Sequence, residues 1–444
     1  MVPFLPRARI GSAKGRIVLR SAFGAGHFAK SLAWSFTDLL FAYYANMRLG
    51  FSAGDTGLLI FLSTALGATV DIGAAYLLRR AEGDVKRILI VQCLAGVATA
   101  GTLLVVFSPG RALDTSFVFL IAALAFFRTA YAFYDVSQNA LVSLLPRDEE
   151  DAHHYAVLRQ TLSGLARLAV AGLAFLLVGD GALAGGREIM VVGAMAILIV
   201  VTASWILRWR SSLRPAEAAP LQGGISLPAG LARLLVAGAA LAGPEAMAVR
   251  VAPFVDGRGP GGQAGAVLLF ALVLGTVIGP LMLPRSGRLM MRSALGFTAL
   301  AVLSAALFFA GLRWGLVALA AAFSHGVGMG GMMALFWREM SAAIRDHAER
   351  TGARADMITF ALLTATIKLS GAVSGAALGL LLDGFKAGAP VTMVGLAGVI
   401  AAGGVVFLLA MAPITGIDPR LSYRDGVSSS GLRRATPPPG NRTT

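Results

Sequence analysis

About twelve apolar segments follow one another along the chain, and each is long enough to cross a bilayer as an α-helix, which takes about 20 residues. Apolar residues make up 57% of the chain and charged residues only 14%, a composition that would leave a soluble protein insoluble. We therefore predict an all-α integral membrane protein in a lipid bilayer. The predicted helices lie near residues 20–46, 54–79, 88–108, 115–145, 155–179, 187–208, 229–254, 263–284, 290–311, 314–341, 356–383 and 390–412.

Basic residues gather in every second linker, while the linkers between them mostly have one basic residue each. Because basic loops stay on the cytoplasmic side, we predict an even number of helices in the inner (plasma) membrane, with both termini cytoplasmic. The net charge of +15 follows from this topology, so we expect no nucleic-acid partner. The single cysteine, Cys93, lies in an apolar run. A single cysteine rules out an intrachain disulfide. We also expect no metal site and no cofactor, and we expect the protein to be a monomer.

A stretch rich in Ser, Pro, Ala and Gly divides the helices six and six. We predict an N-terminal bundle over 1–208, a cytoplasmic linker over 209–228, a C-terminal bundle over 229–412 and a disordered basic cytoplasmic tail over 413–444. A short turn with glycine and basic residues follows the second helix of each half, at 79–87 and 285–292. Two six-helix halves with matching loops are typical of the major facilitator fold, which binds its substrate near the midplane.

Two lone charges interrupt apolar segments: Asp71 lies within 58–78 and Lys368 within 359–382. An ionisable side chain at this depth is costly unless it faces a polar interior, so both indicate function. Asp71 could bind a cation or a proton, or could form a structural ion pair. Lys368 needs a carboxylate partner, and Asp71 and Asp135 from the other half are the candidates.

In the first predicted helix Lys30, Trp34 and Asp38 recur every four residues and share one face. We expect this face to line a wet interior, with the tryptophan stacked on a ligand. The alternative is that Lys30 reaches the membrane interface and Trp34 only packs.

The fourth predicted helix has a polar stripe, which could bind a hydroxyl-rich or zwitterionic solute or could clamp two helices together. The stripe consists of Arg128, Tyr131, Asp135 and either Gln138 or Asn139. At the start of the fifth helix, Arg159 could reach Asp135. We expect the charged cluster at 147–151 to be a solvated turn, and His27 and His325 to be core histidines.

Scattered motifs resemble the melibiose-type glycoside–pentoside–hexuronide:cation symporters of the major facilitator superfamily. The resemblance extends from the first helix to the eleventh, without a long identical run. The matching residues are Gly24-Ala-Gly-His-Phe-Ala-Lys30, Tyr43-Tyr44, Asp71, Tyr134-Asp135, Arg159, Thr351-Gly352-Ala-Arg354 and Lys368.

The family's cation site uses two aspartates and an asparagine of the second helix with a threonine of the fourth. By resemblance Asp71 is the second aspartate, and Gly67, Val70 and Ala132 stand at the other three positions. Only one of the two carboxylates remains, which implies a proton rather than sodium, or no coupling.

The family's sugar-binding residues match this chain in part. Asp135 and Arg159 are retained, whereas Ser31 and Asn139 stand where the family has an aspartate and a tryptophan. Asp38, two turns along the first helix, could compensate in part, and a simple galactoside is disfavoured.

We therefore expect a secondary transporter that works by alternating access on a small polar solute, such as a sugar or glycoside, coupled to H+ rather than Na+. The solute would bind near Asp135, Asn139, Arg159 and Lys368. One alternative is a lysolipid carrier of the same fold, marked by an apolar lateral opening. Another is a non-transporting receptor or scaffold. A membrane enzyme is disfavoured because the HExxH and GxSxG motifs and a histidine cluster are missing from the sequence.

Overall fold

The computed structural model describes residues 13–78, 84–108, 116–145, 149–177, 187–208, 227–254, 263–282, 290–311, 315–351, 356–386 and 390–415. These residues form twelve α-helices and no strand. The helices are α1 (Ala13–Tyr43), α2 (Ala53–Leu78), α3 (Val85–Val106), α4 (Phe117–Leu144), α5 (Glu149–Leu177), α6 (Arg187–Arg208), α7 (Leu231–Val251), α8 (Gln263–Ile278), α9 (Met290–Gly311), α10 (Gly315–Thr351), α11 (Asp356–Lys386) and α12 (Pro390–Thr415).

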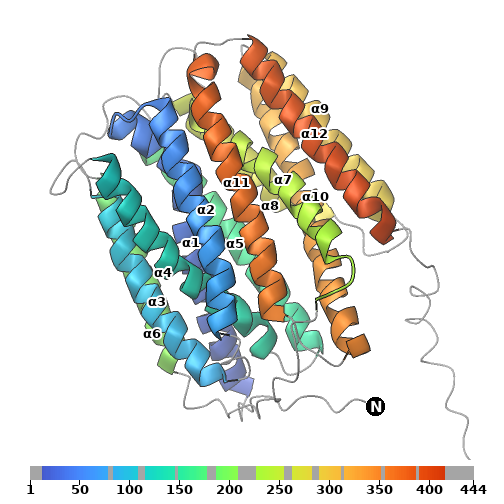
Figure 1. Cartoon of the computed structure of the whole chain (residues 1–444). Coiled ribbons are helices and arrows are strands. Elements are labelled where there is room, and N and C mark those ends of the chain that lie inside the picture. The colour runs from blue at the N-terminus through green and yellow to red at the C-terminus, as the bar shows by residue number, and fades with distance from the viewer. Residues whose placement is uncertain are drawn as a thin grey trace, which may run out of the picture.

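The long axes of these helices run between the lower and upper ends of the bundle in Figure 1, with α1 beginning at the lower end. Nine spans within the described residues are long and apolar enough to cross a membrane. The chain is therefore an all-α, multi-pass membrane protein, as its sequence predicts.

Side chains and glycines mark several helix ends. The Asp84 carboxylate accepts hydrogen bonds from the backbone N–H of Lys86 (3.1 Å) and of Arg87 (3.2 Å), which caps α3. Ser116 caps α4 in the same way through the N–H of Phe119, at 3.2 Å. A short π-helix, η1 (Tyr44–Arg48), continues α1, and the chain then turns at Gly50 with a φ of 74°.

The predicted helix positions are confirmed within a few residues at most ends, and two predicted linkers are partly helical. Helix α10 continues to Thr351, through most of the basic stretch that we expected to be a loop. This stretch contains good helix formers and an ion pair at i,i+4 between Asp346 and Arg350, at 2.5 Å. Helix α5 begins at Glu149, so the expected turn at 147–151 is wrong for residues 149–151. Residues 146–148 lie outside the described residues.

Helices from the two halves of the sequence pack against each other along α2 and α11, α5 and α8, and α1 and α7. Small residues allow the closest approach: a Cβ added at Gly57 of α2 would lie only 2.7 Å from the Cα of Gly379 in α11. Towards the lower end, Leu78 of α2 shares a buried apolar cluster with Met357 and Ala361 of α11. The α2–α11 contact therefore extends over most of the height of the bundle (Figure 1).

The division into two bundles stays a prediction. Residues 209–226 of the predicted linker and residues 416–444 of the predicted tail lie outside the described residues.

Candidate functional site

Four charged side chains meet in the middle of the bundle, and we call them the central cluster. Lys30 of α1 lies 2.5 Å from Asp135 of α4, and Lys368 of α11 lies 2.5 Å from Asp71 of α2. Lys368 is also 4.0 Å from the second oxygen of Asp135. All four are buried, and Asp71 is 0% exposed. The two lone charges that the sequence singles out are therefore in contact, and each of the two lysines faces Asp135.

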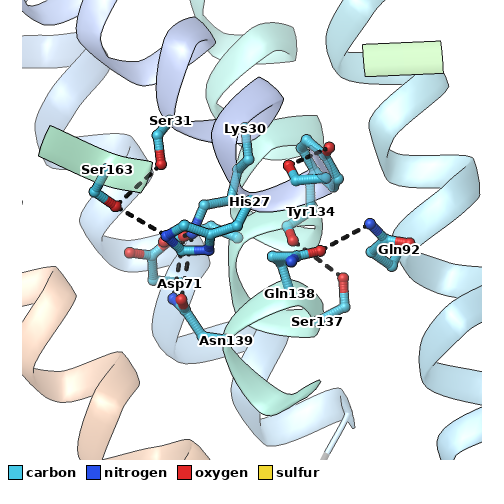
Figure 2. A network of polar contacts seen from close by, with 12 residues as sticks. His27, Lys30, Ser31, Asp71, Gln92, Tyr134, Ser137, Gln138, Asn139 and Ser163 are labelled. Carbon is cyan, nitrogen blue, oxygen red and sulfur yellow. Dashed lines mark hydrogen bonds and ion pairs between the residues drawn. The ribbon is translucent and has the colours of Figure 1, made fainter. Parts of the chain in front are cut away.

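Asn139, one turn further along α4, completes the polar part of this cluster (Figure 2). Its amide nitrogen donates to Asp135 at 3.1 Å, and its oxygen accepts from Lys30 at 3.2 Å. Gln138 points elsewhere: it accepts from Gln92 of α3 at 2.9 Å and donates to the Phe23 carbonyl at 3.2 Å. Asn139 therefore belongs to the central cluster, and Gln138 joins α4 to α3 and α1.

Two aromatic rings border the central cluster. Trp34 of α1 and Tyr131 of α4 have their ring centroids 5.5 Å apart. The ammonium of Lys368 lies 5.2 Å from the Trp34 ring centroid and 5.5 Å from that of Tyr131. The Arg128 guanidinium lies over Trp34 as well, at 4.9 Å. Such distances allow cation–π attraction, which is stronger in a buried site.

A second set of ion pairs, the upper cluster, joins the two halves of the sequence nearer the upper end. Asp38 of α1 accepts a hydrogen bond from Arg250 of α7 at 2.7 Å. Arg167 of α5 pairs with Glu245 of α7 and lies 3.8 Å from Asp38. The sequence predicts Asp38 as a solute-binding residue on the face of Lys30. The structure places its carboxylate between two arginines, because the upper part of α1 faces α7; its role in solute binding stays a prediction.

Arg159 differs from its prediction. In the described part of the chain, Asp135 forms ion pairs with Lys30 and Lys368, and no pair with Arg159 is present. The Arg159 guanidinium instead lies 4.8 Å from the ring centroid of Trp337 in α10. Arg159 therefore contacts a helix of the second half of the sequence, although the charge of Asp135 still acts on it.

The alternative for Lys30, that it reaches the membrane interface, is wrong. Its side chain is 5% exposed and pairs with Asp135.

The two histidines expected in the core, His27 and His325, each lie within hydrogen-bond distance of a partner. His27 Nε2 lies 2.9 Å from the hydroxyl of Ser163 in α5, which is also 3.2 Å from Ser31 (Figure 2). His325 Nδ1 lies 2.9 Å from the carbonyl oxygen of Ala301.

The sequence analysis did not single out three residues with buried polar contacts: Arg167 of the upper cluster, Ser163 beside His27 and Ser31, and Gln92 beside Gln138. Arg167 could have been found by the same signal as Asp71, since it is a lone charge within an apolar stretch of α5. Ser163 and Gln92 could not be found in this way, because a hydroxyl or an amide within a helix gives no sign of its partner on a neighbouring helix.

An open cavity of about 970 Å³ lies between the first parts of α1 and α5, near the lower end. Its lining is mostly apolar, with Ile17, Phe28, Leu158 and Leu162 among the residues, and Arg20 and His154 add polar groups.

Comparisons with known proteins agree with this architecture. The sequence of residues 22–237, which are 216 of the 444 residues, matches a family described as MFS/sugar transport protein. The sequence matches no curated protein.

Two solved structures are similar to the chain. One is a mutant of the nucleoside transporter NupG, with a TM-score of 0.61 and 13% identity, over 88% of this chain and 99% of that one. The other is a bacterial homologue of the human lysosomal transporter Spinster, in an inward-facing and unoccupied conformation. Its TM-score is 0.63 with 13% identity, over 91% of this chain and 98% of that one. The chain therefore has the major facilitator fold of these transporters.

Proposed function

We propose that this protein is a proton-coupled secondary transporter of the major facilitator superfamily, divergent from the melibiose-type symporters. The observation that supports this most is that Lys368, from the second half of the sequence, lies between Asp71 and Asp135 of the first half. A buried ion pair that joins two moving halves is a natural coupling element, because its charge state affects how strongly the halves hold together.

The charges of the central cluster balance, with two lysines and two aspartates. A proton on Asp71 would remove the nearer partner of Lys368 and leave Asp135 as its remaining carboxylate. Lys368 and Lys30 would then compete for Asp135. This competition favours a rearrangement of α11 against α2, which is the motion that alternating access requires.

A proton fits this cluster better than sodium. The positions that match the rest of the family's cation site, Gly67, Val70 and Ala132, offer no side-chain oxygen. A Cβ at Gly67 would lie 3.4 Å from Cδ of Arg128, so the arginine side chain fills the space beside it.

The solute is proposed to bind at the central cluster, next to Trp34, Tyr131 and Asn139. The rings can stack on a flat face of a solute, and the asparagine and charged groups can bind its hydroxyls. A sugar, a glycoside or a related polar compound suits these groups.

A second candidate is an amphipathic solute such as a lysolipid, which the cavity between α1 and α5 favours. A mostly apolar cavity of about 970 Å³ can hold an acyl chain, with Arg20 and His154 near a head group. This candidate retains the same fold and the same central cluster.

Uptake into proteoliposomes tests transport and separates the two candidates. The full chain is reconstituted, and radiolabelled sugars, glycosides and lysolipids are supplied under a proton or a sodium gradient. We expect uptake of one class under the proton gradient, lost in Asp135→Asn and kept in Asp55→Asn, which changes an exposed aspartate of α2. No uptake of either class under both gradients would contradict transport and favour a receptor or scaffold.

A further inference from the structure

Four buried carboxylates of the described residues are paired with four cations, and two of them, Asp135 and Asp38, also lie within 4.0 Å of a second cation. Asp135 pairs with Lys30, Asp71 with Lys368, Asp38 with Arg250 and Glu245 with Arg167. Two further arginines, Arg128 and Arg159, lie among these helices without an ion pair in the described part of the chain. The interior therefore has an excess of positive charge.

Arg128 is the more deeply buried of the two, at 5% exposed. Its Nε and Nη1 atoms are buried and have no hydrogen-bond partner within the described residues. Its guanidinium contacts aromatic faces instead, 4.9 Å from the Trp34 ring centroid and 5.5 Å from that of Phe127. The carboxylates that act on it, Asp38 and Asp71, are held by Arg250 and Lys368.

A guanidinium in such a place is costly, because an arginine stays protonated and a buried, unpaired charge is strongly destabilising. The aromatic faces offset only part of this cost. A guanidinium with free N–H groups binds carboxylate or phosphate oxygens in pairs, and these bonds are strongest away from water. Trp34, which borders the central cluster, lies close to both Arg128 and Lys368, so the Arg128 guanidinium is next to the proposed solute site.

We propose that the transported solute is an organic anion and that Arg128 binds its carboxylate or phosphate group. This inference rests on the proposed transport function and adds the charge of the solute to it. An anion would pair with Arg128 without displacing Asp38 from Arg250 or Asp71 from Lys368. Arg159, which lies 4.8 Å from the ring centroid of Trp337, is a second arginine without an ion pair among the described residues.

The melting temperature (Tm) of the purified, ligand-free full chain gives a test that needs no known solute. We expect Arg128→Met to raise Tm by about 2 °C or more, because it removes an unpaired buried charge and keeps an apolar side chain of similar length. Arg250→Met is the matched control and should lower Tm, because it leaves Asp38 without its closest partner. A fall in Tm for Arg128→Met similar to that for Arg250→Met would overturn the proposal.

Matched solutes test the binding itself. The probes are glucose, glucuronate and glucose 6-phosphate, together with monoacylglycerol and lysophosphatidate, so that carboxylate, phosphate and lipid are compared with neutral parents. We expect at least one anion to raise Tm more than its neutral parent. The extra shift should be lost in Arg128→Met and kept in Arg233→Gln, which changes an exposed arginine of α7.

Gly67→Asp is a second variant that does not remove the arginine. The new carboxylate would project towards Arg128 and neutralise it, so we expect the anion effect to be lost there as well. An anion shift that persists in both variants, or an absence of any anion shift in the parent protein, would overturn the proposal. A neutral probe that stabilises the parent but not Asp135→Asn would overturn it too, and would leave the transport proposal standing.

Discussion

Lys368 of α11 and Asp71 of α2 form an ion pair at 2.5 Å, between residues that are 297 positions apart in the sequence. The pair is almost fully buried, with side-chain exposures of 5% and 0%. It therefore links the charge state of the interior to the contact between the two halves of the sequence.

Removing one member of this pair should cost much more than removing both. Lys368→Met leaves Asp71 as an unpaired buried charge, a change that typically costs about 3–5 kcal/mol. We expect a large fall in Tm for Lys368→Met and for Asp71→Leu, and a substantial recovery in the double variant. Additive losses, measured by thermal unfolding in detergent, would show that the two residues do not interact.

The upper cluster should hold the upper end closed. Asp38→Asn weakens its bonds to Arg250 and Arg167, so the buried Tyr43 should become accessible more often. The measurement is the labelling rate of a cysteine in Tyr43→Cys, in a Cys93→Ser background, with a water-soluble thiol reagent. We expect faster labelling with Asp38→Asn than with the control Asp55→Asn. Equal labelling rates in the two variants would show that contacts other than those of Asp38 hold the upper end closed.

The contact between α2 and α11 should depend on glycine. In Gly57→Ala the added methyl group would meet the backbone of Gly379 at 2.7 Å, so the helices must separate. We expect a lower Tm for this variant. Gly73→Ala is the control, because nothing lies within 4 Å of a Cβ at that position of α2, and alanine favours helix. A similar Tm for both variants would contradict the close packing.

Substitutions at two neighbouring residues of α4 should have different effects, one on thermal stability and the other on solute binding. Gln138→Ala removes buried hydrogen bonds to Gln92 and to the Phe23 carbonyl, so Tm should fall by the equivalent of about 1–3 kcal/mol. Asn139→Ala changes the central cluster, so it should mainly weaken solute-induced stabilisation. If Gln138→Ala mainly weakened solute binding and Asn139→Ala mainly lowered Tm, the solute would bind on the side of α4 that faces α3.

The sequence predicts the helices and the deep charges well, for a physical reason. A bilayer requires long apolar segments and makes each internal charge conspicuous, so Asp71, Asp135 and Lys368 could be found from their positions alone. Their mutual contact also follows, because each buried charge needs an opposite one.

Partners on other helices are harder to predict. The spacing of Lys30, Trp34 and Asp38 correctly places them on one side of α1, but it does not indicate which helix faces each turn. Asp38 faces α7 and Arg159 faces α10, and both were expected at the central cluster. Arg167 was overlooked because charged residues at the start of α5 make the whole helix look less apolar.

The most direct test of the central proposal is solute-induced proton movement into proteoliposomes that contain a pH-sensitive dye. With the solute that gives uptake, we expect the interior to become more acidic for the parent protein. In Asp71→Asn, which has no carboxylate to protonate, solute-driven acidification should be lost. Solute uptake without acidification, or acidification that is unchanged in Asp71→Asn, would contradict the assignment of Asp71 and Lys368 as the coupling pair.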